Sequence, residues 1–156
     1  MIARMLLTSL AAALFTVLTA AAQSIALGER VPEFRNAVWL DGRAPQPAPL
    51  TWIVFFHSSN RACITSIEQF EQLHAASDGR LRVVIVTCEP TDRIEPLLRP
   101  RLNDRTSVAL DPEGRIFAAY GVSYVPFGVL TDSRNRALWQ GNALRLDEPT
   151  FRQTIR

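Results

Sequence analysis

The sequence contains no lysine, so its 17 basic side chains are all arginines. These arginines are scattered along the chain and nearly balanced by 15 acidic residues, which leaves a formal net charge of +2. Proteins that bind nucleic acids usually gather their basic residues on one face or in one segment. The charge pattern therefore gives no indication of a nucleic-acid partner.

Several motifs that mark cofactor or catalytic sites are also missing. The chain has no glycine-rich phosphate loop, no G-x-S-x-G motif and no His, Cys, Asp and Glu set at metal-ligand spacing. It has no internal repeat and no low-complexity segment either. We therefore expect neither a cofactor nor a metal ion.

Cysteine is scarce, and Cys63 and Cys88 are the two that the chain has. No C-x-x-C pair occurs, because Asn60 stands three positions before Cys63 in the stretch FFHSSNRAC, residues 55–63. Two cysteines in an oxidising compartment permit a disulfide if their Cα atoms approach within about 7 Å. The sequence leaves both a Cys63–Cys88 disulfide and two unpaired thiols open.

The first 22 residues have the layout of a secretory signal peptide. An arginine stands near the start, a mainly apolar run extends from Met5 to Ala22, and small residues precede Gln23. Cleavage after Ala22 leaves residues 23–156, enough for one domain with a substantial core. A retained transmembrane anchor is the alternative, and the protein contacts a membrane only in that case. We expect export to a bacterial periplasm.

Hydrophobic patterns predict alternating strands and helices. Residues 50–56 and 81–88 are short, continuously apolar and rich in β-branched side chains, which is typical of strands buried on both faces. Between them, residues 63–77 carry apolar side chains at helical spacing and predict an amphipathic helix that ends near Gly79. A strand–helix–strand unit of this length favours two parallel strands.

The same patterns predict the remaining elements. In chain order these are an arm or hairpin at 28–50 with an extended piece at Ala37–Leu40, a proline-interrupted helix at 89–102, a strand at 106–111, a short helix within 112–122, a hairpin of strands at 126–132 and 136–141, and a final helix at 148–156. The final helix places Phe151 and Ile155 four residues apart on one face.

Two motifs make the sequence resemble the thioredoxin-like superfamily. The apolar WIVFF runs into HSSNRAC, where thioredoxins carry C-x-x-C, and YGVSYVPFGVLTD at 120–132 is similar to the thioredoxin segment with a cis-proline, here Pro126. The early GERVPEF and LDG resemble the exported TlpA-like, or redoxin, branch, so the resemblance covers residues 28–156. It implies an α/β fold, a three-layer sandwich of a mixed central sheet flanked by helices, with an N-terminal β extension.

The resemblance also implies a site, with one departure from the family pattern. In the family, the first cysteine attacks and the second, more shielded cysteine resolves the mixed disulfide. Cys63 falls in the second position and Asn60 replaces the first, which makes the site a degenerate N-x-x-C opposite Pro126. The further binding residues that the resemblance suggests are Val125, Ser59, Arg61 and Glu89.

Asn60 and Cys63 each allow two interpretations. Asparagine is a favoured N-cap, so Asn60 is either a helix cap alone or a cap that also belongs to the site. The first turn of a helix favours a thiolate at Cys63, whereas burial raises a thiol pKa, and free cysteine is also common in protein cores. The sequence does not decide between a reactive and an inert Cys63.

Three functions remain open, and whether the protein is an enzyme is open with them. The first is thiol–disulfide chemistry through Cys63, with protein thiols as partners and a partner cysteine or a small thiol as the resolving group. The second is a non-catalytic module that binds an extended polypeptide beside Pro126. The third is a thiol peroxidase, since peroxiredoxins place their cysteine in the same position. Pro126 occupies the position of their arginine, which leaves Arg61 as a substitute.

Overall fold

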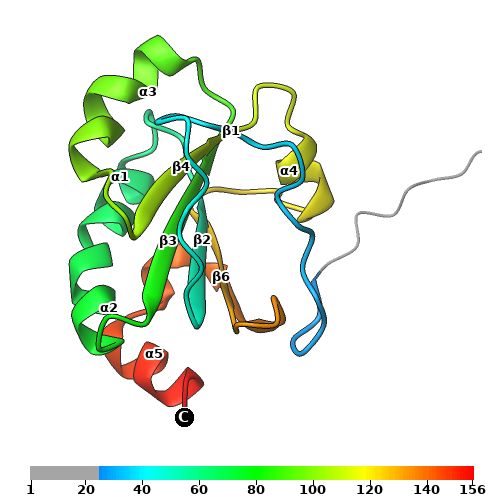
Figure 1. The fold of residues 1–156 in the computed structure, drawn as a ribbon, viewed down its shortest axis with the longest axis vertical. Coiled ribbons are helices and arrows are strands. Elements are labelled where there is room, and N and C mark those ends of the chain that lie inside the picture. The colour runs from blue at the N-terminus through cyan, green and yellow to red at the C-terminus, as the bar shows by residue number, and fades with distance from the viewer. Residues whose placement is uncertain (1–24) are drawn as a thin grey trace, which may run out of the picture.

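A six-stranded mixed sheet forms the middle layer of the computed structural model, which describes residues 25–156 (Figure 1). The strand order is β1-β4-β3-β2-β5-β6. β2 and β4 each pair with β3 in parallel, and the other three pairs are antiparallel. The strands are β1 Val38–Trp39, β2 Leu50–Phe55, β3 Leu81–Thr87, β4 Thr106–Leu110, β5 Phe127–Thr131 and β6 Ala137–Asn142.

Helices cover both faces of this sheet. In Figure 1, α1, α2, α3 and α5 lie on one side of the sheet and α4 lies on the other. The helices are α1 Arg61–Glu68, α2 Phe70–Ala76, α3 Thr91–Leu98, α4 Arg115–Ala119 and α5 Glu148–Thr154, with two 3₁₀ turns, η1 Arg99–Arg101 and η2 Ala143–Arg145. The chain therefore has the thioredoxin-like three-layer fold that the sequence predicted.

The two apolar strands are buried on both faces, as their composition predicted. Trp52 and Val54 of β2 belong to the core beneath α1, α2, α3 and α5, and Ile53 and Phe55 belong to the core on the other face. Successive residues of a strand point to opposite faces, so a strand between two cores needs a continuous apolar run. The parallel pairing of β2 with β3 is confirmed.

The predicted helix at 63–77 differs from the structure in two respects. It begins two residues earlier, at Arg61, because Asn60 caps it. It is also divided into α1 and α2 at Gln69, where no side-chain cap marks the break. The final helix agrees with the prediction, because Phe151 is buried in the core and Ile155 packs against it.

The N-terminal arm, residues 25–49, crosses one face of the sheet from edge to edge. Backbone hydrogen bonds join Gly28 and Glu29 to Ala137 at the start of β6, and β1 then pairs with β4 at the opposite edge. Midway, the Tyr120 hydroxyl donates to the Pro32 carbonyl at 2.6 Å. The predicted β extension is thus a strap whose short strand joins the main sheet.

A close approach between β2 and β5 helps to place the segment that follows Pro126. A Cβ atom at Gly128 would collide with the buried ring of Trp52, so only glycine fits there without rearrangement. Trp52 packs in turn against Trp139 of β6, with ring centroids 5.6 Å apart. The strand after Pro126 is therefore held against the strand that leads to Asn60.

The predicted signal peptide, residues 1–22, lies outside the described residues, and it stays a prediction. Within residues 25–156, no helix is both long and apolar enough to cross a membrane.

Candidate functional site

Asn60 begins α1 as an N-cap. Its backbone is extended, with φ −96° and ψ 113°, and its Oδ1 accepts a hydrogen bond from the Ala62 N–H at 2.9 Å. Its carbonyl accepts the first backbone bonds of the helix, from Cys63 and Ile64. The capping interpretation drawn from the sequence is confirmed, and it places Cys63 in the first turn of the helix.

The other half of the Asn60 amide contacts a segment 65 residues further along the chain. Its Nδ2 donates to the Val125 carbonyl oxygen at 2.9 Å. The Val125–Pro126 peptide bond is cis, and Pro126 is buried. One amide orientation alone satisfies both partners, because Ala62 offers a donor and Val125 an acceptor. Asn60 therefore joins the start of α1 to the segment before β5.

Cys63 is fully buried in the core that α1 shares with the sheet. Burial raises the pKa of its thiol, and the negative charge of Glu89 raises it further, while a hydrogen bond from the His57 backbone offsets part of the rise. The first turn of a helix favours the thiolate, whereas burial of Cys63 favours the neutral thiol. At neutral pH Cys63 is a neutral, shielded thiol.

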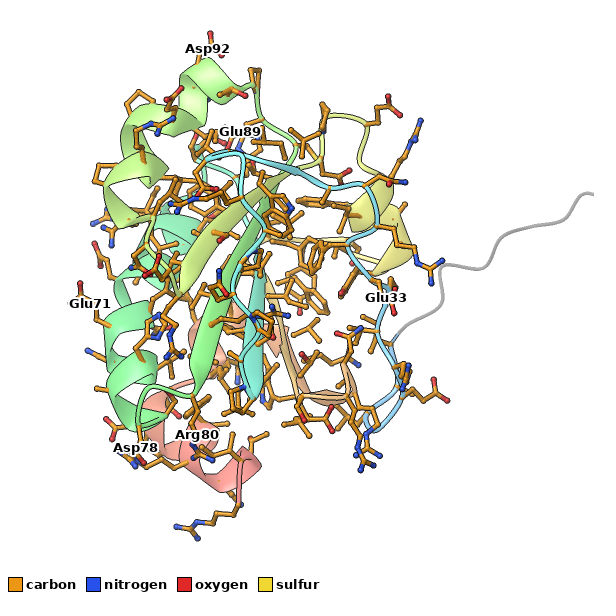
Figure 2. The ribbon with its side chains drawn as sticks, in the orientation of Figure 1. Glu33, Glu71, Asp78, Arg80, Glu89 and Asp92 are labelled. Carbon is orange, nitrogen blue, oxygen red and sulfur yellow. The ribbon has the colours of Figure 1, made fainter. Side chains whose placement is uncertain are left out.

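Glu89 anchors the loop that leads to Asn60. It lies between the end of β3 and the start of α3, at the end of the sheet that is uppermost in Figure 2. Its buried carboxylate accepts from the Ser58 N–H at 2.7 Å and from the Ser58 hydroxyl at 2.5 Å. His57 Nδ1 and Arg93 Nε lie 3.7 and 3.3 Å from Oε1 of the carboxylate.

These contacts keep Glu89 ionised despite its burial. Burial alone raises the pKa of the carboxyl group, but the two Ser58 hydrogen bonds, with the charges of His57 and Arg93, hold the pKa below its usual value. The sequence suggested Glu89 as a residue near the thiol, and the structure gives it a defined contact set. Its charge opposes thiolate formation at Cys63.

Ser59 and Arg61 lie at the surface on either side of Asn60. The Ser59 hydroxyl lies 2.8 Å from His57 Nδ1. The Arg61 side chain makes no ion pair or hydrogen bond with any residue of the described part of the chain. Arg61 is exposed whereas Cys63 is fully buried, so the structure offers no support for Arg61 as the cation that the peroxidase interpretation places beside the thiol.

Cys88 lies at the end of β3 and is partly exposed. Its thiol pKa is raised by burial and by the charges of Asp111 and Glu89. Both cysteines are free, so the disulfide considered from the sequence is not formed in this structure.

The structure thus brings Asn60 next to Val125 and the cis Val125–Pro126 bond, and it places Cys63 in the helical turn that Asn60 caps. Sequence reasoning missed the Asn60–Val125 bond and the role of Ser58. The available signal was that a capping asparagine uses Oδ1 and leaves its Nδ2 free for a second partner.

Two further observations concern the surroundings of the site. A cavity of about 440 Å³ lies between α1, α2 and the α3–η1 segment, and none of its lining residues belongs to the site. Among residues 25–156, no group of three or more His, Cys, Asp or Glu side chains is arranged to hold a metal ion.

Solved structures with the same fold include a protein assigned to thiol–disulfide interchange and an exposed lipoprotein thioredoxin. A Chlorobium tepidum protein assigned as the thiol:disulfide interchange protein DsbE is similar, with a TM-score of 0.67 and 23% identity, covering 85% of this chain and 96% of that one. StoA of Bacillus subtilis has a TM-score of 0.60 and 15% identity, covering 77% and 94%. The exposed lipoprotein thioredoxin Etrx1 of Streptococcus pneumoniae has the same score and identity, covering 76% and 95%.

No protein-family model matches this sequence, and the comparison with curated proteins finds no relative. At these identities the structural likeness establishes the fold, which is that of the thioredoxin-like redoxins, and the chain spans nearly the whole of these neighbours.

Proposed function

We propose that this protein takes part in thiol–disulfide exchange outside the cytoplasm, with Cys63 as its reacting thiol. The observation that carries the proposal is the position of Cys63 in the first turn of α1, a turn whose N-cap, Asn60, is hydrogen-bonded to the Val125 carbonyl. The fold is shared with the Chlorobium tepidum protein assigned as the thiol:disulfide interchange protein DsbE, which supports the same chemistry.

The exchange uses Cys63 and the disulfide of a partner protein. Cys63 gives its proton to solvent, and its thiolate attacks one sulfur of that disulfide. The partner's S–S bond breaks, a mixed disulfide with Cys63 forms, and the other sulfur leaves as a thiolate. A low-molecular-weight thiol or another cysteine of the partner then attacks the mixed disulfide and returns Cys63 to the thiol form. Because Asn60 replaces the first cysteine, this chain does not store the disulfide itself.

The location outside the cytoplasm rests on the predicted signal peptide and on one structural neighbour. Residues 1–22 carry the charged start, the apolar run and the small residues of an export signal. The neighbour Etrx1 is an exposed lipoprotein. An extracytoplasmic compartment is also where structural and catalytic disulfides persist.

A binding module is the second candidate, and the burial of Cys63 favours it. A fully buried thiol with a raised pKa is a poor nucleophile, because the thiolate is the attacking form. In this alternative the chain holds an extended polypeptide beside Pro126 and does no chemistry on it.

Trapping of mixed disulfides separates the two candidates. The full chain is expressed with its leader, free thiols are alkylated during lysis, and the protein is captured and resolved without reductant. We expect reductant-sensitive adducts in wild type and in Cys88→Ser, and none in Cys63→Ser. Adducts that persist in Cys63→Ser would contradict the proposal. Equal capture of the same partner by wild type and Cys63→Ser, without any adduct, would establish the binding module instead.

A further inference from the structure

The amide of Asn60 has two partners, and a helix cap needs only one. Its Oδ1 accepts from Ala62, which is the whole of the capping interaction. Its Nδ2 donates to the Val125 carbonyl, which belongs to the segment between α4 and β5. Aspartate and serine cap helices as well as asparagine does, but neither carries an N–H on a second arm. Helix capping therefore does not account for the hydrogen bond from Asn60 to Val125.

We propose that the hydrogen bond from Asn60 Nδ2 to the Val125 carbonyl is a latch that keeps Cys63 out of reach until a partner chain displaces it. The proposal rests on the proposed function, because it concerns access to the same thiol. The latch consists of this one bond, and the segment it holds is residues 121–126.

The position of Val125 links the latch to the burial of Cys63. Val125 is partly buried, and its side chain packs against the core cluster that contains Cys63. Cys63 itself has no exposed surface. Asn60 holds Val125 from the N-cap position of the same helix turn that carries Cys63. Movement of Val125 away from α1 must break the latch, while the Pro126 carbonyl stays bonded to the Ala143 N–H at 3.0 Å.

The Val125 carbonyl is also an acceptor that an extended polypeptide can use. A chain laid along residues 121–126 presents backbone N–H groups, and one of them can replace Asn60 Nδ2 at this oxygen. The exchange conserves the hydrogen bond at Val125, and the freed Nδ2 bonds to water or to a carbonyl of the partner. Exposed Tyr124 stands next to Val125 and offers the incoming chain an apolar contact. Access to Cys63 thus accompanies docking of an extended chain.

The remaining groups around Cys63 hold the thiol in its protonated form while the latch is closed. Glu89 opposes the thiolate electrostatically and is fixed by Ser58, and the His57 backbone supplies one compensating hydrogen bond. None of these groups contacts Val125 through a hydrogen bond or an ion pair in the described part of the chain. Access and protonation are therefore controlled by different residues.

The test uses the rate at which iodoacetamide alkylates Cys63 in the purified folded chain. The thiolate sulfur displaces iodide, and mass spectrometry of the Cys63 peptide reads the product separately from Cys88. Asn60→Ser keeps a capping oxygen and removes the latch, and Asn60→Ala removes both. Asn142→Ser is the matched control, because Asn142 caps η2 through the same kind of bond, from Leu144 N–H at 3.0 Å.

We expect iodoacetamide to alkylate Cys63 about 2- to 12-fold faster in Asn60→Ser than in wild type. This range corresponds to the net free energy of one neutral hydrogen bond. Asn142→Ser is expected to keep the wild-type rate. The proposal is overturned if Asn60→Ser reacts at the wild-type rate while Asn60→Ala reacts faster, since the cap would then control access. A wild-type rate in both Asn60 variants would overturn it too.

A measurement on wild type keeps the test independent of how the variants fold. The side-chain N–H protons of Asn60 should exchange with solvent more slowly than those of exposed Asn36, because the latch protects one of them. Equal exchange rates would contradict a closed latch. Both results are independent of mixed-disulfide trapping, so the latch can fail while Cys63 still forms adducts, and the reverse can also occur.

Discussion

Two asparagines in this chain begin helical segments with the same capping bond, and they differ in what their amide nitrogens contact. Asn60 starts α1 and Asn142 starts η2, each accepting from the N–H two residues ahead, at 2.9 and 3.0 Å. The amide nitrogen of Asn60 also donates to Val125, whereas no such bond is made by Asn142 within residues 25–156. The cap is a local feature, and the second bond belongs to the site.

The largest effect is expected when Asn60 is replaced by the thiol that the family pattern carries. Asn60→Cys creates C-x-x-C at a helix start, where a first cysteine is exposed enough to attack and Cys63 can resolve. We expect insulin reduction at least about tenfold above the wild-type rate, which should be near background. Asn142→Cys is the control and should stay at background. A folded but inactive Asn60→Cys would show that the site geometry is wrong.

Glu89→Gln should destabilise the protein by about 1–3 kcal/mol, because a partly buried Ser58 donor loses its partner when one oxygen of the buried carboxylate becomes an amide nitrogen. The pKa of Cys63 should fall at the same time, since the charge of Glu89 raises it. Urea unfolding and the pH profile of alkylation measure the two effects. The control Glu95→Gln changes a partly exposed carboxylate on α3 and should cost about 0.5 kcal/mol.

The same substitution yields a pH prediction. The pKa of Glu89 is lower in the folded chain than in the unfolded chain, so its ionised form stabilises the fold fully above the unfolded-state pKa, about 4.3. That stabilisation is lost as the pH falls through the lower, folded-state pKa. The stability difference between wild type and Glu89→Gln should therefore shrink below about pH 4. A constant difference down to the acid transition would contradict the shift.

Truncation to alanine compares the two asparagines directly. Asn60→Ala loses a cap, worth about 1 kcal/mol, and one further hydrogen bond, also worth about 1 kcal/mol. Asn142→Ala loses the cap alone. We expect free energies of unfolding lower by about 2 and about 1 kcal/mol respectively. Equal losses would mean that the Asn60–Val125 bond contributes nothing to stability.

The smallest effect is expected at Arg93. Its side chain is more than half exposed and lies 3.3 Å from the carboxylate of Glu89, so solvent screens the pair. Arg93→Ala should cost about 0.5 kcal/mol in the free energy of unfolding. A loss as large as that of Glu89→Gln would show that Arg93, and not Ser58, holds the carboxylate in place.

The sequence predicted the features that depend on local pattern. The apolar runs at 50–56 and 81–88 become the buried parallel strands β2 and β3, since periodicity and β-branching act within a few residues. Asn60 as an N-cap was equally accessible, because capping depends on the residue and its two successors. The break at Gln69 has no local signal in the sequence.

The resemblance predicted that the Asn60 segment faces Pro126, but it did not predict the hydrogen bonds that join distant segments. The bond from Asn60 to Val125 joins residues 65 apart, and the bonds from Ser58 to Glu89 join residues 31 apart. Burial of Cys63 by the rest of the fold favours the neutral thiol, whereas its position at a helix start favours the thiolate. Tertiary packing therefore decides which form of the thiol is favoured, and the local sequence does not reveal it.

The pH dependence of Cys63 alkylation in the wild-type protein tests the central claim most directly. Cys63 is a buried, protonated thiol that the fold keeps unreactive, so its alkylation should be slow at neutral pH, and the inflection of the pH profile should lie above the pKa of a free cysteine. An inflection below that of a free cysteine would describe an activated, accessible thiolate. It would contradict both the burial of Cys63 and the proposal that the Asn60–Val125 hydrogen bond restricts access to it.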